Sequence, residues 1–521
     1  TPALIIHTFT TLGVSLLAFR FGFGYDPIIH QTAERYVFAH GRILPLQPYY
    51  IGQYAVVAAL SFLTSLPTDL VDRVLVPLLA SITLPLIGLR GLVREYGFSV
   101  DRSRVVFLLV LLFPFSTLTF TVPHNLTVLY LLWLLLLLPK MGVSALPTTA
   151  GILSVFASLV THPLLGVPLG LASLSLCIRN RWRASSSAVA DFAFFLLSVI
   201  VIATSITGMF ALVRLKAGLP AFEFTHVASG AAYFLRFFEP PILPASTPVG
   251  LVALYWYEYA LKCIIPGCAF IFLIAQKGNP VGKAVAALCG GIILAMLLLV
   301  SFTSLPGIAP AEQFEFVLRL RESVSVILWF SAVIAFCRWY FSKTSPRIVS
   351  LLAVCGIGVA SAASLYLAYP QMNEVRKFAG ENVSGAEITA VKKLEEIHKG
   401  TSNYVVLASS LLSVAGLREV GFDRTFETPS GHRAHIYPIG PNEGLFPYAQ
   451  EMLYRGLSND NLEQLLTLVG GRTIYVAVPT SWWRREEIIS DMQKLRARLI
   501  SGTGDVLLYE LPGKSDTQDK Y

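Results

Sequence analysis

The chain has 521 residues, of which 54% are hydrophobic and 14% are charged, and its mean hydropathy is +0.63. Soluble domains carry about 25% charged residues, so this chain has too few polar side chains to cover a water-soluble globule of its length. The formal net charge of +8 does not indicate nucleic-acid binding, because the basic residues stand at the ends of hydrophobic runs, where they set membrane topology.

The apolar runs predict a polytopic α-helical membrane protein. A membrane-spanning helix needs about 20 largely apolar residues. The runs long enough give about eleven spans, at residues 3–21, 74–93, 104–122, 126–140, 148–161, 163–178, 188–213, 250–275, 284–304, 323–341 and 348–368. Segment 51–66 is also apolar, but counting it would reverse every later loop, so we expect it to lie half-buried at the outer interface. Region 148–178, interrupted at Thr161-His162-Pro163, could also be one broken hairpin.

The loops between these spans differ in charge. One set is rich in Arg and Lys, and the positive-inside rule makes it cytoplasmic. The N-terminus is then also cytoplasmic, and its helix, which has no positive n-region and no cleavage site, is a retained span. The opposite set is extracytoplasmic and comprises loops 22–73, 123–125, 214–249 and 305–322, together with residues 369–521. The sequence therefore predicts a multi-pass protein of the cell membrane.

A change in composition marks one domain boundary. Up to residue 368 charge occurs in short clusters, whereas residues 369–521 carry it evenly, as a soluble domain does. Short β-type runs at 404–408, 473–478 and 506–510 alternate there with helical patterns at 384–398, 446–457, 460–469 and 484–500. This alternation predicts an extracytoplasmic α/β domain. It contains no motif for phosphate or metal binding, and we expect its Asp423, His432 and His435 to be surface groups. We expect it to recognise an acceptor or a partner.

A group of polar residues follows the first span directly. Pro27 suits the first turn of a helix and Asp26 suits its N-cap. Asp26, His30 and Glu34 then recur at intervals of four, which places them along one helix face. One interpretation is that Asp26 only caps the helix while His30 and Glu34 face lipid headgroups. The other is that the strip forms a general base or a divalent-metal site, for which carboxylate and imidazole are both suitable.

The arrangement of this segment resembles the GT-C superfamily of polyprenyl-phosphate-dependent glycosyltransferases, which includes protein mannosyltransferases, aminoarabinose transferases and oligosaccharyltransferases. The similarity lies in a first transmembrane helix, a large outer loop that begins with an acidic residue, a short helix, and a following Pro-Tyr segment. In this sequence these are Asp26 through Arg35, His40-Gly41-Arg42-Ile43-Leu44-Pro45 and Gln47-Pro48-Tyr49-Tyr50. The resemblance implies that Asp26 is the catalytic carboxylate of the first outer loop.

The sequence departs from oligosaccharyltransferases in two places. Their second acidic outer motif has no counterpart in Thr121-Val122-Pro123-His124-Asn125, where His124 is the candidate polar group. Their Trp-Trp-Asp signature is absent as well, because Trp482-Trp483 is followed by Arg484. These departures weaken a paired-carboxylate metal site, leave a divalent cation as an open possibility, and favour a single-sugar or non-sequon transferase.

Other outer polar residues are candidates for the same site. His162 lies at the helix break, where a buried histidine is either a packing group or functional. The loop before the tenth span contains Glu312, Glu315, Arg319 and Arg321. Its arginines either contact bulk headgroups and pair with Glu315, or one of them binds the phosphate of a lipid donor. The resemblance implies the second role, since a late outer basic residue commonly serves the donor phosphate in GT-C enzymes.

The sequence thus predicts a membrane glycosyltransferase. Its partners would be a polyprenyl-phosphate-linked sugar donor, an acceptor that is a lipid, glycan or protein, and the membrane lipids. Two alternatives remain: a flippase or transporter, which mid-span charges such as Glu258 would favour, and a non-enzymatic scaffold that presents residues 369–521. An enzyme predicts that Asp26 shares an outer hollow with His124, His162 and an arginine, whereas a scaffold predicts that Asp26 is a buried cap.

Overall fold

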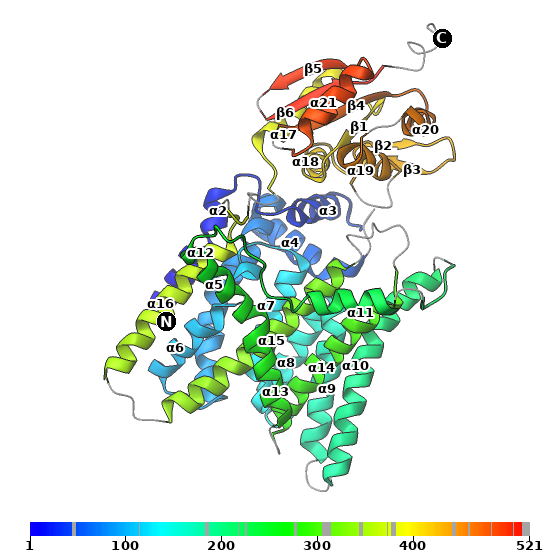
Figure 1. Cartoon of the computed structure of the whole chain (residues 1–521). Helices are drawn as coiled ribbons and strands as arrows, with labels where there is room; N and C mark the ends of the chain where they lie inside the picture. Colours follow the sequence, from blue (N-terminus) through cyan, green and yellow to red (C-terminus); the bar gives the residue numbers. More distant parts are fainter. Residues whose placement is uncertain are drawn as a thin grey trace.

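The structure is a computed structural model of the chain. It describes residues 1–43, 48–113, 115–182, 187–216, 218–224, 227–275, 279–304, 314–342, 347–371, 373–376, 382–439, 444–456, 459–480, 482–503 and 505–512. A bundle of apolar helices forms one part of the molecule, and a smaller α/β domain lies at one end of the bundle (Figure 1). The chain is a polytopic α-helical membrane protein with a C-terminal α/β domain.

Within the described residues, seven helices are long and apolar enough to cross a membrane. They are α5 (Thr68–Arg94), α7 with its 3-10 extension (Pro123–Lys140), α9 (Pro163–Trp182), α10 (Ala188–Lys216), α12 continued through a π-helical turn into α13 (Val249–Ala275), α14 (Pro280–Phe302) and α15 (Glu315–Phe341). Three shorter apolar helices accompany them, α1 (Pro2–Leu12), α4 (Ile51–Thr64) and α8 (Ala145–Thr161), together with the apolar segment Leu352–Ala368 of α16 (Arg347–Ala368). Of the eleven predicted spans, therefore, seven correspond to full-length helices.

Two of the predicted spans are wrong in extent. The first, 3–21, is divided at Gly13 into α1 and a single turn, α2 (Val14–Ala18). The third, 104–122, is only α6 (Val100–Leu111), followed by a 3-10 turn at Ser116–Leu118. The indole N–H of Trp329 donates to the carbonyls of Leu109 and Val110, at 3.0 and 3.2 Å. These carbonyls are thereby satisfied without a further helical turn.

The end of the bundle beneath the α/β domain carries the elements that matter for function. Here α3 (Asp26–His40) and α4 lie between the bundle and the domain (Figure 1), and α11 (Val227–Arg236) packs on α14. We call this the α3 end. Helices α5 and α15 both begin at the α3 end, so their C-terminal residues Arg94 and Arg338 lie at the opposite end. There, Arg338 donates to the carbonyl of Tyr96 at 3.2 Å.

The C-terminal domain has its own sheet and its own core. Its four-stranded sheet has the order β1-β4-β6-β5, with β1 parallel to β4 and the other neighbours antiparallel; the strands are β1 (Tyr404–Ala408), β4 (Thr473–Pro479), β5 (Arg498–Thr503) and β6 (Val506–Glu510). A small hairpin, β2 (Thr425–Glu427) with β3 (Arg433–His435), stands apart. The helices are α17 (Gly385–His398), α18 (Ser410–Val420), α19 (Phe446–Tyr454), α20 (Asn459–Val469) and α21 (Arg485–Lys494).

Most elements of this domain agree with the sequence prediction. The strands at 404–408, 473–478 and 506–510 are confirmed. The predicted helix 484–500 is confirmed as α21 over Arg485–Lys494, but its last residues are wrong, because 495–497 form a turn and β5 begins at Arg498. The surface placement of His435 is also wrong, because the side chain is buried. Its Nδ1 accepts from the backbone N–H of Tyr437 and its Nε2–H donates to the carbonyl of Gly421. Burial lowers the pKa of His435 to about 4, so its role is structural.

Candidate functional site

Helix α3 presents Asp26 at its first turn. Gly24, at a φ of 92°, turns the chain into the helix, and its backbone N–H donates to Asn382 Oδ1 of the C-terminal domain at 2.8 Å. Tyr25, not Asp26, occupies the N-cap position, and no side chain caps the helix. The expectation that Asp26 caps α3 is therefore wrong, and its carboxylate is free to face α15.

Asp26 is bound by an arginine from the other end of the sequence. Arg319 Nη2 lies 2.6 Å from Asp26 Oδ2 and also 2.6 Å from Glu315 Oε1. The Asp26 side chain remains 34% exposed and that of Arg319 is 21% exposed. Solvent and small molecules therefore still reach the carboxylate, and its charge is held in place by one guanidinium.

His30, one turn further along α3, is buried against two tyrosines. Its Nδ1 lies 2.9 Å from the hydroxyl of Tyr54, and the ring of Tyr50 meets it edge-on at 5.2 Å between centroids. Burial, with a further contribution from the charge of Arg319, lowers the pKa of His30 to about 3. At neutral pH His30 is therefore an uncharged imidazole, suited to hydrogen bonding and not to carrying positive charge.

Two more histidines continue this cluster. The ring of His162 stacks on Tyr50 at 5.8 Å, and His124 meets His162 edge-on at 5.5 Å. His124 Nε2 lies 3.8 Å from Glu322 Oε2 on α15. Among the described residues, neither ring nitrogen of His124 has a hydrogen-bond partner. The fold thus places the helix break at residue 162 and the start of α7 around the same space as His30.

Glu34 faces a different environment. Its side chain is fully buried and accepts a hydrogen bond from Gln53 at 2.8 Å, and the same Gln53 amide reaches Asp72 at 3.2 Å. Burial, together with the negative charge of Asp72, raises the pKa of Glu34 well above its ordinary value. The predicted strip of Asp26, His30 and Glu34 therefore exists on α3, but Glu34 lies away from Asp26 and behind Gln53.

A basic cavity of about 310 Å³ opens beside Arg321. It combines apolar walls with charged groups: Phe237, Ile242, Leu243, Tyr255 and Tyr259, and Arg236, Glu239, Glu258, Lys262, Arg321 and Arg376. Arg321 lies over the ring of Phe237 at 5.5 Å and donates to its carbonyl at 3.3 Å. Lys262, on the π-helical turn, and Arg376 share Glu258 at 2.6 and 2.8 Å. Such a cavity suits an anion with an apolar tail.

The structure brings together most of the predicted site residues. Asp26, Glu315 and Arg319 form one ion-paired group, and His30, His162 and His124 form an aromatic cluster with Tyr50. The charge of Arg319 reaches this cluster, because it helps to lower the pKa of His30, and Arg321 lies two residues from Arg319 on α15. Glu312 lies outside the described residues. Tyr50, Lys262 and Glu322 are site residues that the sequence interpretation missed. A charged pair four residues apart, Glu258 and Lys262, within an otherwise apolar span was the signal for the cavity.

The arrangement offers no obvious metal centre. Within the part of the chain that the structure describes, no group of three or more His, Cys, Asp or Glu side chains is close enough to hold a metal ion. Among the residues that the structure describes, the divalent cation that the sequence left open has no such ligand set. The groups that remain for chemistry are a carboxylate, neutral imidazoles and cations.

Eight solved protein chains are similar to this chain. The crystal structure of ArnT from Cupriavidus metallidurans bound to undecaprenyl phosphate is 13% identical to this chain, with a TM-score of 0.48 over 98% of this chain and 97% of that chain. No family model and no curated protein sequence matches. The function proposed below therefore rests on the contacts of this chain.

Proposed function

We propose that this chain is a membrane glycosyltransferase of GT-C type, which moves a sugar from a polyprenyl-phosphate-linked donor to a lipid, glycan or protein acceptor. One observation carries the proposal: a solvent-accessible carboxylate, Asp26, is held by Arg319 of α15, and Arg321, two residues further along the same helix, lines a basic cavity with apolar walls. A flippase or scaffold has no need of an accessible carboxylate and a cationic cavity held by the same helix.

In this proposal Asp26 is the general base. It removes the proton of the acceptor hydroxyl, whose oxygen attacks the anomeric carbon while the bond to the donor phosphate breaks. The base must approach the hydroxyl within about 3 Å. The Asp26 side chain is 34% exposed, so an acceptor hydroxyl has access to it. In the unloaded site Arg319 neutralises Asp26. A bound anionic donor would compete with Asp26 and Glu315 for Arg319, which would free the Asp26 carboxylate to accept the proton.

Arg321 is the donor-phosphate residue in this scheme. It lines the cavity and makes no ion pair among the described residues, whereas Arg319 already binds two carboxylates. A guanidinium matches two phosphate oxygens, and Lys262 stands across the same cavity. The leaving polyprenyl phosphate gains charge as the bond breaks, so these cations stabilise the departing group. The neutral His30, Tyr50 and His162 would line the path of the sugar hydroxyls.

The α3 end is extracytoplasmic in this proposal. The support is the charge asymmetry of the loops, since basic residues such as Arg94 and Arg338 lie at the end opposite to α3. The C-terminal domain then also lies outside the cytoplasm, on the side where Asp26 meets the acceptor.

The test is transfer of sugar from a polyprenyl-phosphate donor by purified Asp26→Asn protein. The amide is the same size but does not accept the acceptor proton, so turnover should fall by about a hundredfold or more. Glu315→Gln is the matched comparison, because it removes the other carboxylate from the same Arg319 nitrogen. It should lose less than about tenfold, in keeping with an exposed ion pair. Equal turnover in Asp26→Asn and the parent would refute the role of Asp26.

A further inference from the structure

Helix α3 is embedded in the C-terminal domain on the face opposite to the bundle. Ile28 of α3 is fully buried and belongs to the hydrophobic core of that domain, although about 350 residues separate them in sequence. Tyr25 and Ile29 pack against the same core. The helix that carries Asp26 is thus a shared element of both parts of the protein.

Arg418 of α18 is the polar centre of this contact. Its guanidinium donates to the carbonyl of Phe21 at 3.1 Å and to Gln31 Oε1 at 3.4 Å, and lies 3.6 Å from Asp69 at the start of α5. In the other direction, Arg35 of α3 donates to the backbone carbonyl of Arg418 at 2.7 Å and lies 3.4 Å from the same Asp69. One domain residue therefore joins the loop before α3, the middle of α3 and the start of α5.

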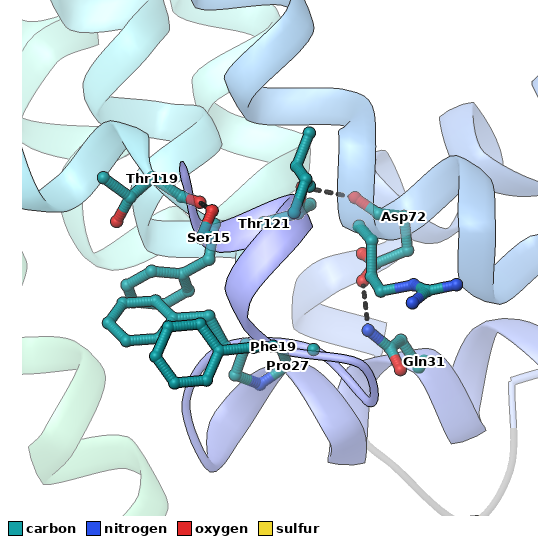
Figure 2. A pocket seen from close by; sticks show the side chains of 12 residues that line it. Ser15, Phe19, Pro27, Gln31, Asp72, Thr119 and Thr121 are labelled. Atoms are coloured by element: carbon teal, nitrogen blue, oxygen red, sulfur yellow. Dashed lines mark hydrogen bonds between the residues drawn. The ribbon is translucent and has the colours of Figure 1, made fainter. Parts of the chain in front are cut away.

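The contact continues into the bundle through side chains. Gln31 donates to Asp72 at 3.0 Å, and the hydroxyl of Thr121 donates to the carbonyl of Asp72 at 2.5 Å (Figure 2). Thr121 lies three residues before His124. Pro27 and Gln31 point into the same small space in Figure 2. The chain from Arg418 through Gln31 and Asp72 thus fixes α3 relative to α5 and to the turn that carries His124.

We propose that Arg418 is a positioning residue, through which the C-terminal domain holds α3 so that Asp26 meets Arg319. It touches no substrate in this scheme. The inference rests on the proposed function for its catalytic consequence, but it also predicts a structural one: without Arg418, α3 exchanges its backbone hydrogens faster. A misplacement of about 1 Å at a reacting group costs up to a hundredfold in rate. A loosened α3 therefore lowers turnover, while the donor cavity, whose lining contains no residue of α3, keeps its affinity.

The experiment compares Arg418→Ala and Arg418→Lys with the parent in the full-length protein. Hydrogen exchange is measured over residues 26–40, and kcat and the KM for the donor are measured in parallel. Arg418→Ala should raise exchange in α3 and lower kcat by about ten- to a hundredfold, with the donor KM changed by less than about twofold. Arg418→Lys keeps the charge near Asp69, so its hydrogen exchange in α3 and its kcat should lie between those of Arg418→Ala and the parent.

Arg424→Ala is the matched control. Arg424 is paired with Glu395 at 2.8 Å within the same domain, so its loss perturbs the domain without touching α3. Its exchange in α3 and its kcat should match the parent. Unchanged α3 exchange in Arg418→Ala, or equal increases in both variants, would overturn the proposal. If Arg418→Ala does not fold, Asp69→Asn takes its place, because it removes the carboxylate that Arg35 and Arg418 share. Hydrogen exchange in α3 and kcat are then measured on Asp69→Asn, with the same expected changes. A parent without glycosyl transfer would refute the proposed function alone, because the exchange comparison needs no substrate.

Discussion

Replacing Glu34 by Gln should make the protein more stable at neutral and alkaline pH. Glu34 is fully buried, and burial with the adjacent charge of Asp72 raises its pKa well above the ordinary value of 4.5. A group with a raised folded-state pKa destabilises the fold as pH rises, because the unfolded chain loses its proton first. The cost is absent below about pH 4.5, grows as pH rises towards the folded-state pKa, and is constant above it.

The magnitude follows from the linkage slope. Each pH unit between the unfolded and folded pKa values removes about 1.4 kcal/mol of stability. Gln at position 34 carries no proton to lose, keeps an oxygen that accepts from Gln53, and offers an amide to Asp72. Its own cost should be that of one altered hydrogen bond, about 1 kcal/mol. At pH 4.5 the variant should match the parent or be slightly less stable, and at pH 7.5 it should be more stable.

The assay is the thermal unfolding midpoint in detergent, measured at several values of pH between 4.5 and 8.5. The midpoint difference between Glu34→Gln and the parent should increase with pH. Glu315→Gln serves as control, since the Glu315 side chain is 53% exposed, and its midpoint difference should change little over this range. A Glu34→Gln protein that loses stability equally at all pH values would refute the reasoning, because Glu34 would then be ionised in the folded state.

Three further predictions follow from other contacts. A Cβ at Gly52 would lie 2.5 Å from Thr161 Oγ1 and 2.8 Å from its backbone nitrogen, so Gly52→Ala should cost about 1–3 kcal/mol and lower the unfolding midpoint, whereas Gly250→Ala, with no atom within 4 Å, should not. Arg321→Ala should weaken polyprenyl-phosphate binding, measured in detergent, by about ten- to a hundredfold, and Arg321→Lys should weaken it by less. Arg338→Ala, at the other end of the same helix, should leave the affinity unchanged. If both Arg321 variants bind the lipid phosphate as tightly as the parent, Arg321 is not part of the site. A reporter active only in the cytoplasm should be silent when fused to the C-terminus, and a bright signal would reverse the orientation.

Local sequence determined the elements whose signal lies within a few residues. Pro27 starts α3, and Gly41, at a φ of 65°, ends it in the left-handed conformation that glycine adopts most readily. The three β-type runs of the C-terminal domain became its strands because each is a short apolar run bounded by polar residues. The position of Asp26 at a helix start, and the apolar spans around it, were likewise available from the sequence.

The tertiary structure decided everything that depends on distant partners. Asp26 and Arg319 are 293 residues apart, and periodicity does not show which arginine of α15 turns towards α3. The predicted helix 484–500 ran into the first three residues of β5. The left-handed Arg496, at a φ of 55°, ends the helical segment, and pairing with β6 then determines the strand.

The tertiary structure also decided which polar side chains are buried. Glu34 and His435 are polar residues that the sequence alone favours at a surface, yet the fold buries both. Gln53, 19 residues away, donates to Glu34, and the carbonyl of Gly421, 14 residues away, accepts from His435. Burial of a polar side chain is tolerated only where such partners exist, and the partners are brought together only by the fold. The sequence therefore determined which residues are candidates for chemistry, and the packing of α3 between α15 and the C-terminal domain decided which of them come together in the proposed site.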